Sequence, residues 1–238
     1  MEFATHQHAK EWNFAEGEIL LVDKPLNWTS FDVVAKIRNL IKVKKVGHGG
    51  TLDPLATGLL IIATGKKTKM LQDLQNADKS YRMTLCLGAT TPSYDAEFPP
   101  ENIQPTDHLT EAEVIQAFNS FRGTTQQLPP AFSAIKTKGK TAYELARKGI
   151  QPELQPREVT ISKIELIAYH SPQEIIIDVD CSKGTYIRSL AHDIGQSLGV
   201  GGYLKGLVRT RIGAFRLEEA WGWEELLTEL KGLYPKVG

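Results

Sequence analysis

A glycine-rich segment with one carboxylate is the first feature of the sequence that could carry chemistry. GHGGTLDPLATG, residues 47–58, places Asp53 directly before Pro54. Asp-Pro pairs are common in turns, but the density of glycine indicates that the backbone closely approaches another group. His48 shares the loop, and the apolar run LLIIA (59–63) predicts a buried strand that would hold it rigidly. A carboxylate held in this way could act as a nucleophile or a general base.

Nucleotide-binding motifs do not account for these glycines. In ATGKKTK, Gly65-Lys66 is followed by Lys67 rather than Ser or Thr, and Leu60 stands where a phosphate-binding loop requires glycine. No G-x-G-x-x-G opens a helix after a strand. The sequence therefore predicts neither a phosphate-binding loop nor a dinucleotide site.

Arg188 is a second candidate, in the first turn of a predicted helix over about residues 186–198. A cation at that position opposes the helix dipole by roughly 0.3 to 1 kcal/mol. Pairing with a carboxylate or a phosphate would offset this cost. The alternative is a surface arginine lying along its own helix. The buried stripe expected for the helix consists of Ile187, Leu190, Ala191, Ile194 and Leu198.

The composition is that of an ordinary globular chain long enough to bury a core, with 238 residues, 41% hydrophobic and 24% charged. No apolar run resembles a signal peptide or a membrane span, so we expect a cytoplasmic protein. Cys86 and Cys181 lie in strand-like runs and are expected to be buried free thiols. No Cys/His cluster has the spacing of a zinc site.

The net charge is zero, from 28 basic and 28 acidic side chains, but the basic residues are grouped along the chain. Segregated charge of this kind can form a basic face that binds nucleic acid. Solvated helix faces that point in different directions are an equally good interpretation. The groups are Lys36, Arg38, Lys42, Lys44 and Lys45; Lys66, Lys67 and Lys69; Lys136, Lys138, Lys140, Arg147 and Lys148; and Lys205, Arg209, Arg211 and Arg216.

Periodicity predicts strands and helices in irregular alternation, which favours a mixed, largely antiparallel sheet with helices packed on it. Ser30 is the expected N-cap of a helix over 31–42, with Phe31, Val34, Ile37 and Ile41 as its apolar stripe. A basic, proline-interrupted segment over about 124–150 reads as an inserted arm with one short helix. Further strands are expected at 18–25, 59–63, 81–88, 160–170, 174–181 and about 208–217, and a further helix at 111–121.

Five motifs in order resemble the TruB-type tRNA pseudouridine synthases, the family that makes pseudouridine-55 in the T arm of tRNA. They are LVDKPLNWTSFDVV, KKVGHGGTLDPLATGLL, KSYRMTLCLG, LPPAFSAIKTKGKTAYELARKG, and CSKGTYIRSLAHDIG followed by LKGLVRTRIGAF. The resemblance runs from about residue 18 to about residue 217. A single G-x-L-D-P match would be weak, but five motifs at sensible spacing are specific.

The resemblance implies roles for individual residues. Asp53 is expected to be the catalytic aspartate, Tyr81 to stack on the target uracil, and Arg188 to pair with the aspartate. The expected contacts with substrate, including the active-site wall and the RNA near the flipped nucleotide, are His48, Tyr186, Leu207, Lys24 and Lys136.

The resemblance also implies the pseudouridine synthase fold, a mixed α/β (α+β) fold with a central, mostly antiparallel sheet, flanking helices and an inserted arm. We expect a flexible tail over residues 1–16 and a single catalytic domain over 17–238. Its insertion at about 124–150 grips the T arm, and no room remains for a C-terminal PUA RNA-binding module. Phe98 departs from the family pattern, because relatives usually keep a glycine there; Ser93 replaces a frequent threonine, whereas Asp95 is retained.

The chemistry of the reaction explains these residue types. Isomerising uridine breaks the bond from C1′ to N1 and joins C1′ to C5 without redox change, so we expect no cofactor and no metal. An ionised aspartate could attack C1′, or take a proton from C2′ to give a glycal. A nearby arginine would keep it ionised by lowering its pKa. The base must leave its stack, and an aromatic ring such as Tyr81 can receive it.

The expected partner is tRNA, bound through its T arm by a monomer that needs neither a membrane, a guide RNA nor a protein partner. Phosphate contacts should make the binding depend on salt. Two alternatives stay open. The protein could act mainly as an RNA-binding or tRNA-folding module, or it could modify a T-loop-like stem-loop of another RNA.

Overall fold

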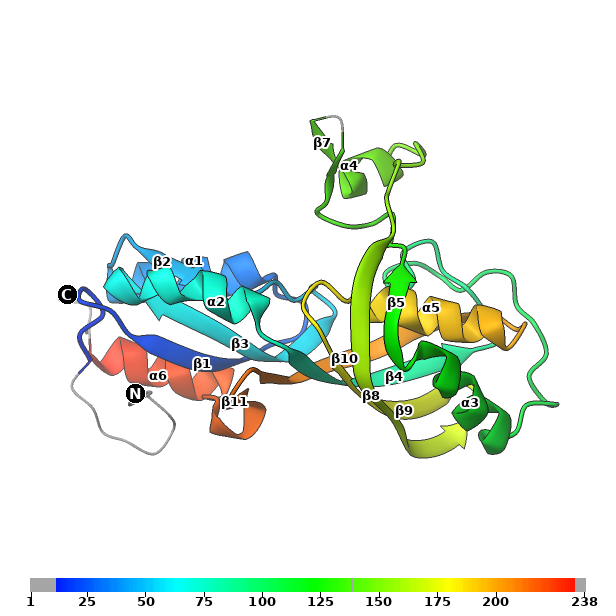
Figure 1. The fold of residues 1–238 in the computed structure, drawn as a ribbon. Coiled ribbons are helices and arrows are strands. Elements are labelled where there is room, and N and C mark those ends of the chain that lie inside the picture. Colours follow the sequence, from blue (N-terminus) through cyan, green and yellow to red (C-terminus); the bar gives the residue numbers. More distant parts are fainter. Residues whose placement is uncertain (1–11, 138, 234–238) are drawn as a thin grey trace. The chain divides into compact units, whose positions relative to one another are not determined.

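The computed structural model describes residues 12–137 and 139–233, which form two compact units (Figure 1). Among the described residues, the first unit comprises 12–81 and 208–233, and the second comprises 82–137 and 139–207. Strands β4 (Lys79–Leu87) and β10 (Gly202–Ile212) each contribute residues to both units. Both units combine helices with antiparallel strands, as expected from the sequence.

The sheet of the first unit runs in the order β1-β3-β10. Strand β1 (Ile19–Lys24) pairs antiparallel with β3 (Ala56–Thr64), in a register that sets Lys24 opposite Gly58. Strand β2 (Val46–His48) also pairs with β3, and β11 (Phe215–Arg216) pairs with β10. The helices of this unit are α1 (Ser30–Ile41), α2 (Leu71–Asn76) and α6 (Trp223–Leu233), with short 3₁₀ helices at Gly65–Met70 and Leu217–Glu219.

Strand β3 is buried on both faces, which explains its continuous apolar run. Leu60 and Ile62 pack with residues of α1 and α6, whereas Leu59 and Ile61 pack with Leu74 of α2 and other residues on the opposite face. Both faces of β3 are thus packed against other elements, which hold the strand in place. The predicted strand at 59–63 is confirmed and forms the centre of this unit.

Helix α1 begins one residue earlier than we predicted. Its N-cap is Thr29 rather than Ser30, and Thr29 forms a capping box with Asp32. Phe31 is 63% exposed, because it lies about 200° around the helix from the buried Val33. Phe31 was therefore wrongly placed in the buried stripe, whose members are Val33, Val34, Ile37 and Ile41.

The described part of the expected N-terminal tail packs on the core. Phe14 is buried and stacks on Trp12 at 5.1 Å between ring centroids, and Trp12 also contacts Trp221. Residues 12–16 therefore do not behave as the flexible tail that we predicted. The rest of that tail, residues 1–11, lies outside the described residues.

The sheet of the second unit runs in the order β10-β4-β9-β8-β5. Strands β8 (Arg157–Ser171) and β9 (Glu174–Cys181) form a long antiparallel pair, and β5 (Gly123–Gln127) pairs with β8. Helices α3 (Glu111–Phe118) and α5 (Ile187–Ser197) belong to this unit, and a short 3₁₀ helix at Asn119–Phe121 follows α3. The last long strand, β10, begins at Gly202, earlier than the predicted 208.

The predicted insertion at 124–150 is corrected at its start, because residues 123–127 are strand β5 of the main sheet. The excursion from the sheet is residues 128–156, which we call the arm. It carries the small hairpin β6 (Lys136–Thr137) and β7 (Lys140–Thr141), followed by helix α4 (Ala142–Ala146). In Figure 1 the arm lies beyond the ends of β5 and β8.

Cys86 and Cys181 are buried free thiols, as predicted. Among the described residues, no helix is long and apolar enough to span a membrane. In the same part of the chain, no group of three or more His, Cys, Asp or Glu side chains could hold a metal ion.

Candidate active site

The loop that carries Asp53 connects β2 to β3 in the first unit. Asp53 is half-buried, and its carbonyl oxygen accepts a hydrogen bond of 3.0 Å from the N–H of Ala56. Ser30 fixes the preceding residue from the start of α1, because its Oγ accepts from the N–H of Leu52 at 2.8 Å and donates to the carbonyl of Leu52 at 3.2 Å. The loop thus presents a carboxylate from a backbone that other elements hold in place.

The glycines of this loop serve close packing within the protein. A Cβ at Gly58 would lie 2.4 Å from the carbonyl oxygen of Arg209, and the residue has φ of +97°. A Cβ at Gly49 would lie 3.2 Å from the Cβ of Leu74. The close approach that we expected from the glycine density is therefore to the chain itself at these two positions.

Lys24 lies buried beside the Asp53 loop and holds its backbone. Its side chain is 0% exposed, and its ammonium group donates to the carbonyls of Trp28 at 2.6 Å, Pro25 at 2.9 Å and Pro54 at 3.5 Å. Burial lowers the pKa of Lys24 to about 8, an effect that the nearby negative charge of Asp53 opposes. This burial argues against the substrate contact that we predicted for Lys24.

Arg209 is a second buried cation beside the loop, and the sequence analysis missed its role. It is 1% exposed and donates to the carbonyls of Leu59 at 2.8 Å, Gly50 at 3.1 Å and Thr51 at 3.2 Å. Burial lowers its pKa, and its described partners include no carboxylate. We had counted Arg209 in a basic surface group; its position in the apolar-flanked run LVRTRI was the available signal that it lies inside.

Tyr81 is tied to the same cation. Its side chain is buried, and its hydroxyl accepts a hydrogen bond from Arg209, since a guanidinium group can only donate. Arg209 therefore connects Tyr81 to the two residues, Gly50 and Thr51, that lead into Asp53. The predicted stacking residue and the predicted catalytic loop share one buried anchor.

His48 stands at the start of the loop and is half-buried. Its Nδ1 accepts from the N–H of Gly50 at 3.4 Å, which assigns the proton of the neutral ring to Nε2. Burial lowers the pKa of His48, so the imidazole is uncharged at neutral pH. Its predicted RNA contact would then be a hydrogen bond or a stacking contact rather than a charge pair.

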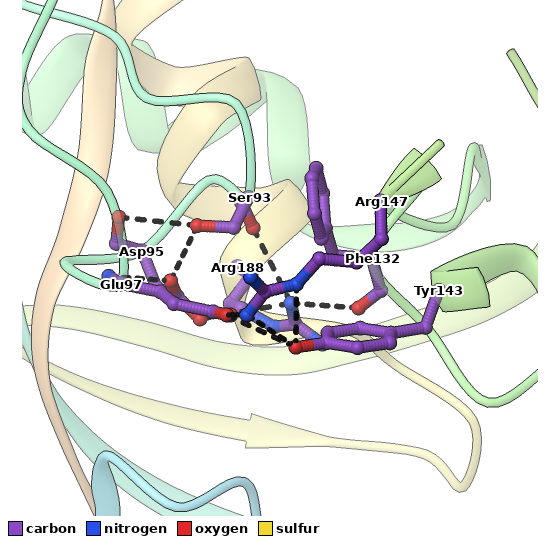
Figure 2. Close-up of polar contacts among 7 residues, drawn as sticks. All are labelled: Ser93, Asp95, Glu97, Phe132, Tyr143, Arg147 and Arg188. Carbon is purple, nitrogen blue, oxygen red and sulfur yellow. Dashed lines mark hydrogen bonds and ion pairs between the residues drawn. The ribbon is translucent and has the colours of Figure 1, made fainter. Parts of the chain in front are cut away.

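Arg188 forms the centre of a polar cluster in the second unit (Figure 2). It is 6% exposed, and its Nη1 donates to the carbonyls of Phe132 at 3.0 Å and Ser93 at 3.3 Å. It also forms an ion pair of 3.6 Å with Asp95. The reading of Arg188 as a surface arginine is therefore wrong, and Asp95 offsets the cost of a cation in the first turn of α5.

Asp95 is itself held by its neighbours. Its Oδ1 accepts from the hydroxyl of Ser93 at 2.6 Å and from the N–H of Glu97 at 3.0 Å. Asp53 and Arg188 belong to different units, so the pairing that we predicted between them stays a prediction.

The other predicted contacts occupy distinct elements of the second unit. Tyr186 is half-buried at the N-cap of α5, and its backbone exchanges hydrogen bonds of 2.8 and 3.1 Å with the side chain of Gln127. Leu207 is half-buried on β10. Lys136 is exposed on β6 of the arm, as a contact with phosphate requires. Lys138, from the same basic group, lies outside the described residues.

Comparison with protein families identifies the chain along most of its length. The TruB family pseudouridylate synthase N-terminal domain matches residues 38–187, and the tRNA pseudouridylate synthase B C-terminal domain matches residues 188–232. Neither match depends on the geometry described above, so the two lines of evidence are independent.

Individual relatives agree with the family match. The chain is 54% identical over 213 residues to tRNA pseudouridine synthase B of Phocaeicola vulgatus, across 87% of this chain and 90% of the relative. It is 53% identical over 213 residues to the protein of that name in Bacteroides fragilis, across 87% of this chain and 91% of the relative.

A solved structure shares the fold. A chain in the crystal structure of a Cbf5-Nop10-Gar1 complex matches with a TM-score of 0.71 at 31% identity, over 92% of this chain and 55% of that one. From the family matches and the relatives together, we conclude that the chain belongs to the TruB family of pseudouridylate synthases and is an isomerase.

Proposed function

We propose that this isomerase converts uridine-55 in the T arm of tRNA to pseudouridine, with Asp53 as the catalytic carboxylate. The observation that carries the proposal is the support of the Asp53 loop. Two fully buried cations, Lys24 and Arg209, donate to backbone carbonyls on both sides of Asp53 in sequence, while Asp53 itself stays half-exposed. A loop fixed in this way holds a reactive group in place before the substrate arrives.

Asp53 acts on the ribose of the flipped nucleotide. As a nucleophile it attacks C1′ and releases uracil from N1; as a base it removes the proton from C2′ and gives a glycal. Uracil then turns and its C5 attacks C1′, which displaces the Asp53 carboxylate in the first route and is accompanied by return of the proton to C2′ in the second. The proton on C5 leaves last, and N1 takes up a proton. Both routes need the ionised carboxylate.

Tyr81 provides the ring on which the flipped uracil stacks, and Arg209 fixes that ring by binding its hydroxyl. Arg188 is the residue that we propose to pair with the carboxylate of Asp53 during the reaction. Because Arg188 already donates to two carbonyls and pairs with Asp95, its guanidinium plane is oriented within its own unit.

The arm supplies phosphate contacts to the T arm. Lys136 and Lys140 are exposed on its two short strands, and both bear charges that RNA phosphates attract. The enzyme works as a monomer without a guide RNA.

The test is to map the modified position. Unmodified tRNA transcripts are incubated with the protein, treated with a carbodiimide that marks pseudouridine, and read by primer extension. The proposal expects a single stop that reports residue 55 and no stop in a transcript with cytidine at that position. A stop at another uridine, or none in tRNA but one in a different T-loop-like RNA, would overturn the assignment.

A further inference from the structure

Glu97, Tyr143 and Arg147 form a cluster that joins the arm to the loop between β4 and α3, which carries Asp95 (Figure 2). The Nη2 of Arg147 donates to Oε1 of Glu97 at 2.6 Å, and the hydroxyl of Tyr143 donates to the same oxygen at 3.1 Å. The Nε of Arg147 donates to the Tyr143 hydroxyl at 3.0 Å. Arg147 and Tyr143 come from the arm and Glu97 from the loop. These contacts therefore join two segments that are far apart in sequence.

Aromatic side chains add to these contacts between the arm and the loop, which we call the junction. Phe98 of the loop lies 5.0 Å from Phe132 of the arm, and Phe132 meets Tyr143 edge to face at 5.7 Å. The guanidinium group of Arg147 lies 5.6 Å from the ring centroid of Phe98 and 5.3 Å from that of Tyr143. Phe98 stands where the resemblance led us to expect a glycine, and the structure gives it this contact with the arm.

The junction is connected to Arg188 on both sides. Phe132 packs on Phe98 with its ring and accepts from Arg188 with its carbonyl at 3.0 Å. Glu97 accepts from Arg147 with its side chain, and its N–H donates to Asp95, the carboxylate paired with Arg188. Displacing the arm from the loop would move one carbonyl that holds Arg188 and loosen the backbone beside Asp95.

We propose that Glu97 and Arg147 are positioning residues, which dock the arm on the loop and thereby set the orientation of Arg188. This inference rests on the proposed function, in which Arg188 acts with the catalytic aspartate. The side chains of Arg147 and Glu97 are 53% and 31% exposed, so water and salt screen their ion pair. The arm can therefore leave the loop and dock again. RNA that binds the arm would change the orientation of Arg188 through these contacts.

The experiment compares Glu97→Gln, Arg147→Gln, the double variant and the charge-exchanged pair Glu97→Arg with Arg147→Glu. Matched controls are Glu101→Gln, an exposed acid of the same loop, and Lys148→Gln, an exposed cation next to Arg147. Steady-state kinetics with tRNA give kcat and KM. Hydrogen exchange of peptides from residues 128–150, without RNA, reports arm docking independently of activity.

We expect each single variant to lower kcat by about fivefold, which corresponds to about 1 kcal/mol of barrier. The double variant should lose no more than either single variant, and the charge-exchanged pair should recover part of the loss. Exchange in the arm should quicken in the same variants. Lys148→Gln should raise KM without lowering kcat, and Glu101→Gln should change neither arm exchange nor kcat.

Two results would overturn the inference. Faster exchange in the arm with an unchanged kcat would separate docking from Arg188. A change confined to KM in Arg147→Gln, with no effect of Glu97→Gln, would make Arg147 a phosphate contact only. If the wild-type protein failed to modify tRNA, the proposed function would fail, while hydrogen exchange would still report whether Glu97 and Arg147 dock the arm.

Discussion

The Asp53 loop of the first unit and the Arg188 cluster of the second both depend on a buried arginine that donates to backbone carbonyls. Arg209 binds carbonyls of β3 and of the Asp53 loop from inside the core. Arg188 binds the carbonyls of Ser93, which is buried, and of Phe132 in the arm. The segments that carry these two residues also meet through the half-exposed side chains of Glu97 and Arg147. The first site is held by contacts inside the core, whereas the second combines the buried contacts of Arg188 with the half-exposed ion pair of Glu97 and Arg147.

This difference separates two tasks. A catalytic carboxylate benefits from a frame that does not move, because misplacement costs rate. A cluster attached to the arm, which we propose to bind RNA, can respond when the arm binds. Mutations of the buried cations at the first site should therefore lower stability and activity together, and mutations of Glu97 or Arg147 beside the second site should lower activity with little loss of stability.

Arg209→Met should have the largest effect on stability. It leaves the buried carbonyl of Leu59, the part-buried carbonyls of Gly50 and Thr51 and the Tyr81 hydroxyl without this donor, and each unsatisfied buried group costs roughly 1 to 3 kcal/mol. We expect a loss of roughly 3 kcal/mol or more in the free energy of unfolding by urea. Arg216→Met, the same change at an exposed position of the same unit, should cost less than about 0.5 kcal/mol. Equal losses in the two variants would remove Arg209 from the frame of the site.

Tyr81→Phe is a smaller change at the same site, because the ring stays and only the hydroxyl bonded to Arg209 is lost. We expect kcat to fall by about a hundredfold if the hydroxyl also handles a proton, and by less if it only fixes the ring. Single-turnover rates with tRNA measure the effect. An unchanged rate would assign the hydroxyl of Tyr81 to packing alone.

Asp193→Asn tests a partly buried carboxylate on α5, which belongs to neither of the two sites compared above. Burial raises the pKa of Asp193 from 3.8 to about 6. The folded protein then binds a proton more tightly than the unfolded chain, so stability falls as pH rises from about 4 to about 6. Asparagine avoids this penalty and should stabilise the fold by about 1 to 2 kcal/mol above pH 6, with the gain vanishing near pH 4.

Thermal unfolding of the wild type and Asp193→Asn at about pH 4 and about pH 8 measures this gain. A variant that is less stable than the wild type at the higher pH would mean that the charged Asp193 has a stabilising role.

Lys136→Gln with Lys140→Gln should have the smallest effect, since both side chains are exposed on the arm. Each lost phosphate contact should reduce the slope of log affinity against log salt by about 0.7 to 0.9. The free energy of unfolding should not change. Filter binding of tRNA at several salt concentrations gives the slope, and an unaltered slope would exclude the hairpin of the arm from the interface.

The sequence predicted the elements with strong periodicity well, because their patterns are local. The strand at 59–63, the helix near 186–198 and the mixed antiparallel architecture are confirmed. The N-cap of α1 was misplaced by one residue, because Thr29 and Ser30 are both good caps and we overlooked the local spacing of Thr29 and Asp32 that forms the capping box.

The polar framework of the site could not be predicted in the same way. Lys24 and Arg209 look like surface cations in sequence, and their burial follows from carbonyls supplied by residues as much as 159 positions away. Arg188 was correctly marked as a residue in need of a partner, but the carbonyl of Phe132 carries no sequence signal. Backbone acceptors become visible only when the fold brings segments together.

The central claim is that Asp53 isomerises one uridine of tRNA from a loop that is already formed. The most direct measurement is tritium release from tRNA labelled at C5 of uracil, with wild-type protein and Asp53→Asn compared alongside their tRNA affinities. The account predicts release of one tritium per tRNA by the wild type, none by the variant, and nearly equal binding. Release by Asp53→Asn at the wild-type rate, or loss of binding together with activity, would contradict it.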